Sequence, residues 1–193
     1  MKSKAVLLRF NRLLLAGFIA AAAALAVLQV AKAGPPSPTD VPDSIQVDTA
    51  HNKVFLIGHA TGVQIYTCNG SVWSSAVPRA NLYGDNGQLI IHHFKGPSWQ
   101  ANDGSTVVGK LDAPPLIKNQ DSVAWLRLSI ASRTAGPDGG DRLLDTSFIQ
   151  RIHTVGGIAP PAADCNAATA GQVVEQPYTA DYIFWKHTGA AAA

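Results

Sequence analysis

The chain is poor in the residue patterns that define common enzyme classes. Its only glutamate is Glu175 and its aspartates gather in predicted loops, which argues against the paired carboxylates of glycosidases. A GxSxG nucleophile motif is absent, and the glycine pairs at 139–140 and 156–157 do not join a strand to a helix as a nucleotide-binding GxGxxG does. The six histidines show neither HxH nor HExxH spacing. The sequence therefore predicts no cofactor and no metal site.

Basic residues are scarce once the N-terminal segment is set aside. Residues 1–33 begin with MKSKAVLLRFNR, continue with an apolar run over 13–30 and end in Ala-Lys-Ala, the pattern of a secretory signal peptide cleaved after Ala33. A retained membrane anchor is the alternative, because the run approaches the length of about 20 residues that spans a bilayer. The segment holds five of the 15 basic residues and none of the 13 acidic ones, so the remaining chain has 10 against 13, a net charge of −3. A mildly acidic chain without a basic cluster predicts no binding to nucleic acid and, after cleavage, none to a membrane.

Cysteine occurs only twice, at Cys68 and Cys165. A signal peptide implies a periplasmic or extracellular location. In such an oxidising compartment, two cysteines this far apart favour one structural disulfide, with a catalytic thiol as the alternative.

Composition divides the remaining chain into three parts. Residues 34–44, GPPSPTDVPDS, hold four prolines and predict an extended leader outside the core. Residues 45–187 fit a single β domain, and 188–193 form an alanine-rich tail.

Strand-length segments rich in Val, Ile, Thr and aromatic residues fill the predicted domain. They lie at 54–58, 62–68, 89–94, 105–111, 124–132, 147–155 and 178–185. The first two are close enough to form a hairpin through 59–61. No long helical repeat is present, and the alanine-rich 160–171 has room for a turn or two. The pattern predicts an all-β fold: an antiparallel sandwich or barrel of short strands, with long Gly/Pro-rich loops and one disulfide.

Alternation within two of these segments assigns faces. On one strand, Leu126, Leu128 and Ile130 are expected on one face, and Trp125, Arg127 and Ser129 on the opposite face. On the other strand, Ile149, Arg151 and His153 are expected opposite Phe148, Gln150, Ile152 and Thr154.

The segment from His92 to Gly109, HHFKGPSWQANDGSTVVG, predicts a three-element β-meander with turns at Gly-Pro and Asp-Gly. As neighbours on a strand, His92 and His93 face opposite ways, so they cannot bind one metal together. One of them is expected in the core. Trp99 fits a core plug or loop anchor better than a sugar-stacking platform.

Six segments in order resemble one family. They are GVQIYTC (62–68), HFKGPSW (93–99), DGSTVVG (103–109), AWLRL (124–128), IQRIHTVGGIAP (149–160) and YTADYIFW (178–185). Together they resemble the secreted domain of unknown function 3455 family of bacteria and fungi, over roughly residues 41–187. The resemblance implies a secreted single domain and carries no activity. Where relatives tend to show an acid and an asparagine, this chain has Gln100 and His153, which weakens acid/base or metal roles at those positions.

Two functions from different classes follow from these observations. The first is a ligand-binding or envelope-associated module with a small-molecule or glycan surface built from His93, Trp99, Asp103 and Arg151. The second is a secreted enzyme, a hydrolase or a metal-assisted one, using His93 with Asp103 and His153, which requires these three side chains to converge. A purely structural or adhesive protein, with a flat patch in place of a pocket, is a third possibility.

Overall fold

The structure is a computed structural model that describes residues 38–189. The predicted signal peptide, the first part of the leader and the last four residues of the tail lie outside the described residues. Across 38–189, no helix has both the length and the apolar character needed to cross a bilayer.

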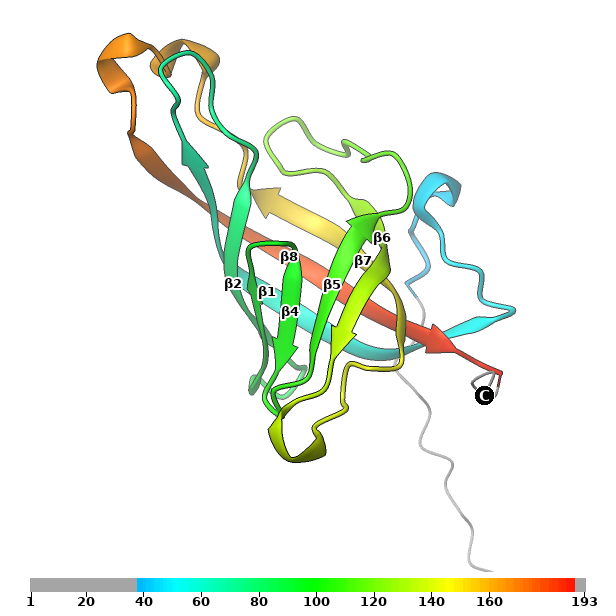
Figure 1. Ribbon diagram of the computed structural model, residues 1–193. Helices are drawn as coiled ribbons and strands as arrows, with labels where there is room; N and C mark the ends of the chain where they lie inside the picture. Colours follow the sequence, from blue (N-terminus) through cyan, green and yellow to red (C-terminus); the bar gives the residue numbers. More distant parts are fainter. Residues whose placement is uncertain (1–37, 190–193) are drawn as a thin grey trace, which may run out of the picture. The chain divides into compact units, whose positions relative to one another are not determined.

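Eight antiparallel strands close into a barrel in sequence order, with β8 paired to β1 (Figure 1). The all-β prediction is confirmed, and of its two architectures the barrel is the one formed. The strands are β1 (Asn52–Thr67), β2 (Val77–Tyr83), β3 (Leu89–Phe94), β4 (Ser98–Ala101), β5 (Thr106–Leu111), β6 (Leu126–Thr134), β7 (Thr146–Gly156) and β8 (Val173–His187). Four short 3-10 turns complete the described structure: η1 (Asp43–Ile45), η2 (Pro137–Gly139), η3 (Ala162–Asp164) and η4 (Ala167–Thr169).

The predicted hairpin between 54–58 and 62–68 is wrong, because these residues form the single long strand β1. Residues 59–61 pair with β2 on one side and with β8 on the other, so no turn interrupts the strand. Gly62 leaves room for the neighbouring strand β2: a Cβ built there would stand 2.3 Å from the carbonyl oxygen of Arg79. This glycine, next to the predicted turn, therefore serves close strand packing.

Strand β2 was not predicted, because VPRANLY contains a proline and few β-formers. Pro78 stands second in the strand, near its beginning, where sheets tolerate proline. The predicted meander over 92–109 is confirmed as β3, β4 and β5, which pair in that order.

Apolar side chains form two separate clusters, one on each side of the barrel wall. The inner cluster fills part of the barrel and includes Leu82, Ile91, Trp99, Leu128, Ile149, Tyr182 and Phe184. The outer cluster lies against β6, β7 and β8 and includes Trp125, Ile152, Ile183 and Trp185. The predicted faces of 125–128 are confirmed, since Leu126 and Leu128 belong with the inner cluster and Trp125 with the outer one.

The segment before β1 covers the outer cluster. Val41, near the end of the predicted leader, is buried there together with Ile45 and Val47 of the predicted domain, so the last residues of the leader pack against this cluster. Hydrogen bonds fix it to the wall: Gln150 Nε2 donates to the carbonyl of Ile45 at 2.7 Å, and Arg127 Nη1 donates to that of Gln46 at 2.5 Å.

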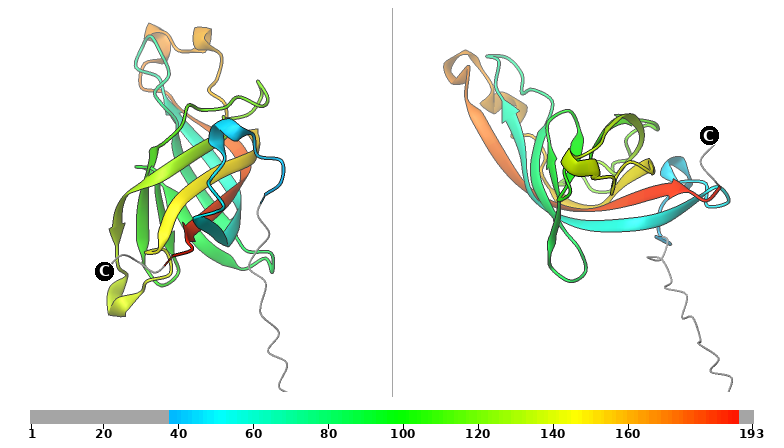
Figure 2. Two further views of the ribbon diagram at one scale, coloured as in Figure 1. Left: turned by 90° about the vertical axis from the view of Figure 1, so that its right-hand side faces the viewer. Right: turned by 60° about the horizontal axis from the view of Figure 1, so that its bottom comes forward.

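The up-and-down topology gives the barrel two distinct ends. The connections 68–76, 95–97, 112–125 and 157–172 lie at one end, the upper end in Figure 1. The connections 84–88, 102–105 and 135–145 lie at the other. We call these the pocket end and the far end, since the cavity described below opens among the first group. The long strands β1 and β8 extend beyond the shorter ones towards the pocket end (Figure 2).

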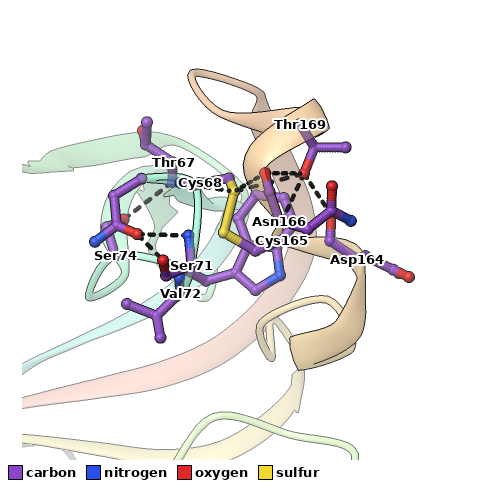
Figure 3. The surroundings of a disulfide bond; sticks show 12 residues. Thr67, Cys68, Ser71, Val72, Ser74, Asp164, Cys165, Asn166 and Thr169 are labelled. Atoms are coloured by element: carbon purple, nitrogen blue, oxygen red, sulfur yellow. Dashed lines mark hydrogen bonds between the residues drawn. A yellow bond between two sulfur atoms is a disulfide. The ribbon is translucent and has the colours of Figure 1, made fainter.

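The predicted disulfide between Cys68 and Cys165 is confirmed. Cys68 follows β1, and Cys165 lies in the connection between β7 and β8, so the bond joins two connections at the pocket end (Figure 3). Nearby, Asn166 accepts from the amide of Ala168, while the Thr169 hydroxyl accepts from the Asn166 amide. This capping box orders the turn that carries Cys165.

Replacing both cysteines by serine should lower the free energy of unfolding by about 4 kcal/mol, because the bond closes a loop between residues 97 apart in sequence. Denaturant unfolding of the oxidised protein and of the Cys68→Ser/Cys165→Ser variant would measure the difference. A thiol assay on the denatured, unreduced protein should find no free thiol, and two reactive thiols would contradict the prediction.

Candidate functional site

A pocket of about 610 Å³ enters the barrel from the pocket end. Its wall is largely apolar and is formed by residues from seven of the eight strands and from three connections. The polar side chains in that wall are few: Gln64, Ser75, His93, Lys95 and Arg151, together with the amphipathic rings of Trp99 and Tyr182. A concave, mainly apolar cavity with a small number of polar groups is the usual form of a small-molecule site.

Three buried residues of the inner cluster also belong to the pocket wall, namely Trp99, Leu128 and Tyr182, and the partly buried Leu126 packs beside them. They form the boundary between the filled part of the barrel and the open part. The turn Lys95-Gly96-Pro97 between β3 and β4 also lines the pocket, so the meander predicted over 92–109 supplies both a rim and a floor.

The floor is built around an aromatic stack. The rings of His93 and Trp99 are parallel, with centroids 4.4 Å apart, and the ring of Tyr182 meets both edge-on. The two stacked side chains are cross-strand partners on β3 and β4, which brings them together on the inner face. Gly109 leaves room for the indole: a Cβ there would lie 3.0 Å from Trp99 Cζ3. His92 faces outward and pairs with Asn81, so the predicted opposition of the two histidines is confirmed.

His93 is neutral in the folded protein. Burial lowers its pKa to about 3; the hydrogen bond to the carbonyl of Ser98 opposes this shift, and the charge of Arg151 adds to it. Because a carbonyl can only accept, Nδ1 carries the proton that is donated to Ser98 at 2.8 Å. Nε2 is therefore left as a hydrogen-bond acceptor, and His93 brings no positive charge to the pocket.

Arg151 is the charged group of the inner wall. It stands on β7 opposite Tyr182 of β8, and its Nε and Nη2 both donate to the carbonyl of Ala124, at 3.0 and 2.7 Å. Among the described residues, no carboxylate lies within ion-pair distance of its guanidinium. Its Nη1 makes no hydrogen bond within that part of the chain.

Two further N–H groups in the pocket wall lack acceptors. Gln64 Nε2 and Trp99 Nε1 are fully buried without a hydrogen-bond partner in the described structure, and each of these side chains is 1% exposed. Leaving a buried donor unpaired costs about 1–3 kcal/mol. Both donors belong to residues of the pocket wall, although neither nitrogen is itself exposed to the cavity.

Asp103 lies at the far end, away from the pocket. It sits in the turn between β4 and β5, where its carboxylate accepts from the hydroxyl and amide of Ser105 and from the amide of Arg142. Partial burial raises its pKa, but these hydrogen bonds outweigh that effect and lower the pKa to about 2. The carboxylate therefore ties two connections of the far end together.

His153 lies on the outside of the wall. A register shift interrupts β7 between Ile152 and Val155, and His153 has a positive φ of 50°. This bulge turns the side chain outward, so the predicted face of Ile149 and Arg151 is not continued by His153. Left-handed backbone of this kind is uncommon outside glycine, and histidine, like asparagine and aspartate, is among the residues that adopt it more often.

On the outer surface, His153 takes part in a chain of histidines and aspartates. Its Nδ1 is 2.8 Å from Asp181 and its Nε2 is 2.9 Å from Asp40, while Asp181 also contacts His59, which in turn contacts Asp85. Partial burial lowers the pKa of His153, but the two carboxylates outweigh it and the net pKa is raised. The carboxylates of Asp85 and Asp181 likewise raise the pKa of His59.

The trio proposed for an enzyme does not converge. His93 is inside the barrel near the pocket end, Asp103 is at the far end, and His153 is on the outer surface. The bulge in β7 turns His153 outward, and Asp103 lies in a connection at the opposite end of the barrel from the pocket. Neither separation could be seen in the sequence. Within residues 38–189, no group of three histidine, cysteine or acidic side chains is arranged to hold a metal.

Of the four proposed ligand-binding residues, His93, Trp99 and Arg151 line one pocket and Asp103 does not. Sequence reasoning missed Gln64 and Tyr182. The first lies on a strand that was split into a hairpin, and the second has the ordinary appearance of a core aromatic. Only the unpaired amide of Gln64 distinguishes it, and that is visible in the structure alone.

Asp103→Ala should lower the free energy of unfolding by about 2 kcal/mol, because the hydrogen bonds that its half-buried carboxylate accepts at the far end would be lost. Small-molecule binding at the pocket should not change. Thermal unfolding alongside Asp145→Ala, an exposed aspartate in the neighbouring connection, provides the matched comparison. If Asp103→Ala left the stability unchanged and weakened small-molecule binding, the placement of Asp103 in a structural role would be wrong.

Asp181→Asn should remove a pH-dependent contribution to stability. Histidines with raised pKa values stabilise the fold fully below their unfolded pKa, near 6.5, and this stabilisation disappears as the pH rises through the folded pKa. The free energy of unfolding of the wild type should therefore exceed that of the variant most on the acidic side of that window. Urea unfolding as a function of pH, with Asp121→Asn as control, would test it; a pH-independent difference would refute it.

A family model described as "Protein of unknown function (DUF3455)" matches residues 49–186. No curated protein and no solved structure matches the chain.

Proposed function

The chain belongs to the domain of unknown function 3455 family, whose description names no activity, and we propose from the pocket that it is a small-molecule-binding barrel. The observation that carries the proposal is a largely apolar cavity of about 610 Å³, whose wall includes Arg151 and two residues with buried, unpaired N–H groups. A barrel that served only as a structural element would gain stability by filling this space.

The pocket wall favours an apolar ligand body over a glycan. Leu126, Leu128 and three prolines stand in the wall, and one face of the Trp99 ring is covered by His93. A sugar-binding platform needs an open aromatic face, which the buried indole does not offer.

Exposed apolar side chains are also concentrated at the pocket end. The seven large hydrophobic side chains exposed among residues 38–189 all lie on connections or strand ends there: Val72, Phe94, Leu111, Ile117, Val155, Ile158 and Val173. This end of the barrel therefore offers more exposed apolar surface than the far end does.

Export to the periplasm or the extracellular space is part of the same proposal. The disulfide supports it, since such bonds persist in oxidising compartments. It also joins two connections at the pocket end. An envelope-associated role is compatible with a binding barrel and requires no binding residue beyond those of the pocket.

The test is binding of a neutral apolar fluorophore, N-phenyl-1-naphthylamine, whose emission rises in apolar surroundings. Wild-type protein should bind it, and Ala76→Trp, a substitution at an exposed position of the pocket rim, should weaken binding at least about tenfold by narrowing the mouth. Ala131→Trp, an exposed position of β6 outside the pocket, is the matched control and should bind as the wild type does. Absence of binding, or equal binding by all three proteins, would contradict the proposal.

A further inference from the structure

The charges around the pocket have one sign. Lys95 stands on its rim and Arg151 in its inner wall, and none of the residues that line it is acidic. His93 adds an acceptor and no charge, because its pKa lies far below neutrality. The positive charge of the cavity is therefore not balanced by any side chain that faces it.

The hydrogen-bonding groups also point to an acceptor-rich ligand. Arg151 uses Nε and Nη2 on one backbone carbonyl and leaves Nη1 without a partner in the described structure. Gln64 Nε2 and Trp99 Nε1 add two unpaired donors that are completely buried. Guanidinium and amide N–H groups are suited to the oxygens of an anionic group, and such hydrogen bonds are stronger than neutral ones.

The rest of the wall does not favour a strongly hydrated, multiply charged ligand. Beyond these few groups it consists of prolines, aliphatic side chains and aromatic rings. Burying several charges against such a surface would cost more than a single cation could offset. One anionic group on an apolar body satisfies both parts of the pocket.

We propose that the ligand is an organic acid, an apolar molecule with a single anionic group that Arg151 binds. This assignment rests on the proposed function, since it names the class of molecule for the same pocket. Arg151 fixes the position of the anion through an existing anchor: its two bonds to the carbonyl of Ala124 hold the guanidinium before the ligand arrives.

The experiment compares two probes with the same apolar skeleton, N-phenyl-1-naphthylamine and its sulfonated form, 8-anilinonaphthalene-1-sulfonate. In fluorescence titrations, Arg151→Gln should weaken binding of the sulfonate about tenfold and leave that of the neutral probe within about twofold. Arg151→Lys, which keeps the charge, should retain part of the preference. Arg79→Gln removes a cation that pairs with Glu175 outside the pocket and should change neither affinity.

The outcomes separate this inference from the proposed function. If Arg151→Gln leaves both affinities unchanged, or weakens both equally while circular dichroism shows an intact fold, the anion assignment is wrong. Binding that is still blocked by Ala76→Trp would then show that the pocket binds apolar molecules in general. If neither probe binds the wild type, the proposed function fails and the anion assignment fails with it.

Discussion

The pairing of β1 with β8 is the interaction on which the rest of the structure depends. It runs from Asn52 opposite His187 to Thr67 opposite Val173, and it joins the first strand of the barrel to the last. Closure removes both sheet edges, so every strand has two neighbours and the inner face is shielded from solvent. The pocket exists because this closed wall is only partly filled by the inner cluster.

Polar groups at the two ends of the barrel differ in whether the protein itself satisfies their hydrogen bonds. The far end is tied by Asp103, whose carboxylate is fully used by hydrogen bonds within the protein. The pocket end has the opposite character, since Gln64, Trp99 and Arg151 keep donors that the described chain does not use. Proteins tend to leave such groups unsatisfied where they bind something. The contrast between the ends is the main physical support for placing a ligand at one of them.

Much of the fold could be predicted from the sequence because strand periodicity and turn chemistry are local. The meander over 92–109 follows from its Gly-Pro and Asp-Gly turns, and the opposition of His92 and His93 and the faces of Trp125 and Leu126 follow from period-2 alternation. The sequence did not reveal the continuity of β1, because a strand that accepts close neighbours on both sides uses the same small residues as a turn. It did not reveal the bulge at His153 either, since a single positive φ reverses a face without changing the composition. The composition of the pocket depends on which strands meet across the barrel, and this required the structure.

The covering of the outer wall has a consequence for where this protein can be cut. The family match begins at residue 49, yet Val41, Ile45 and Val47 are buried against Trp125, Ile152 and Ile183. A chain trimmed to the matched region would expose that apolar sheet face to water. It would also deprive Arg127 and Gln150 of the carbonyls of Gln46 and Ile45. The smallest autonomous unit is therefore longer than the region matched by the family model, and expression of the domain should begin before Val41.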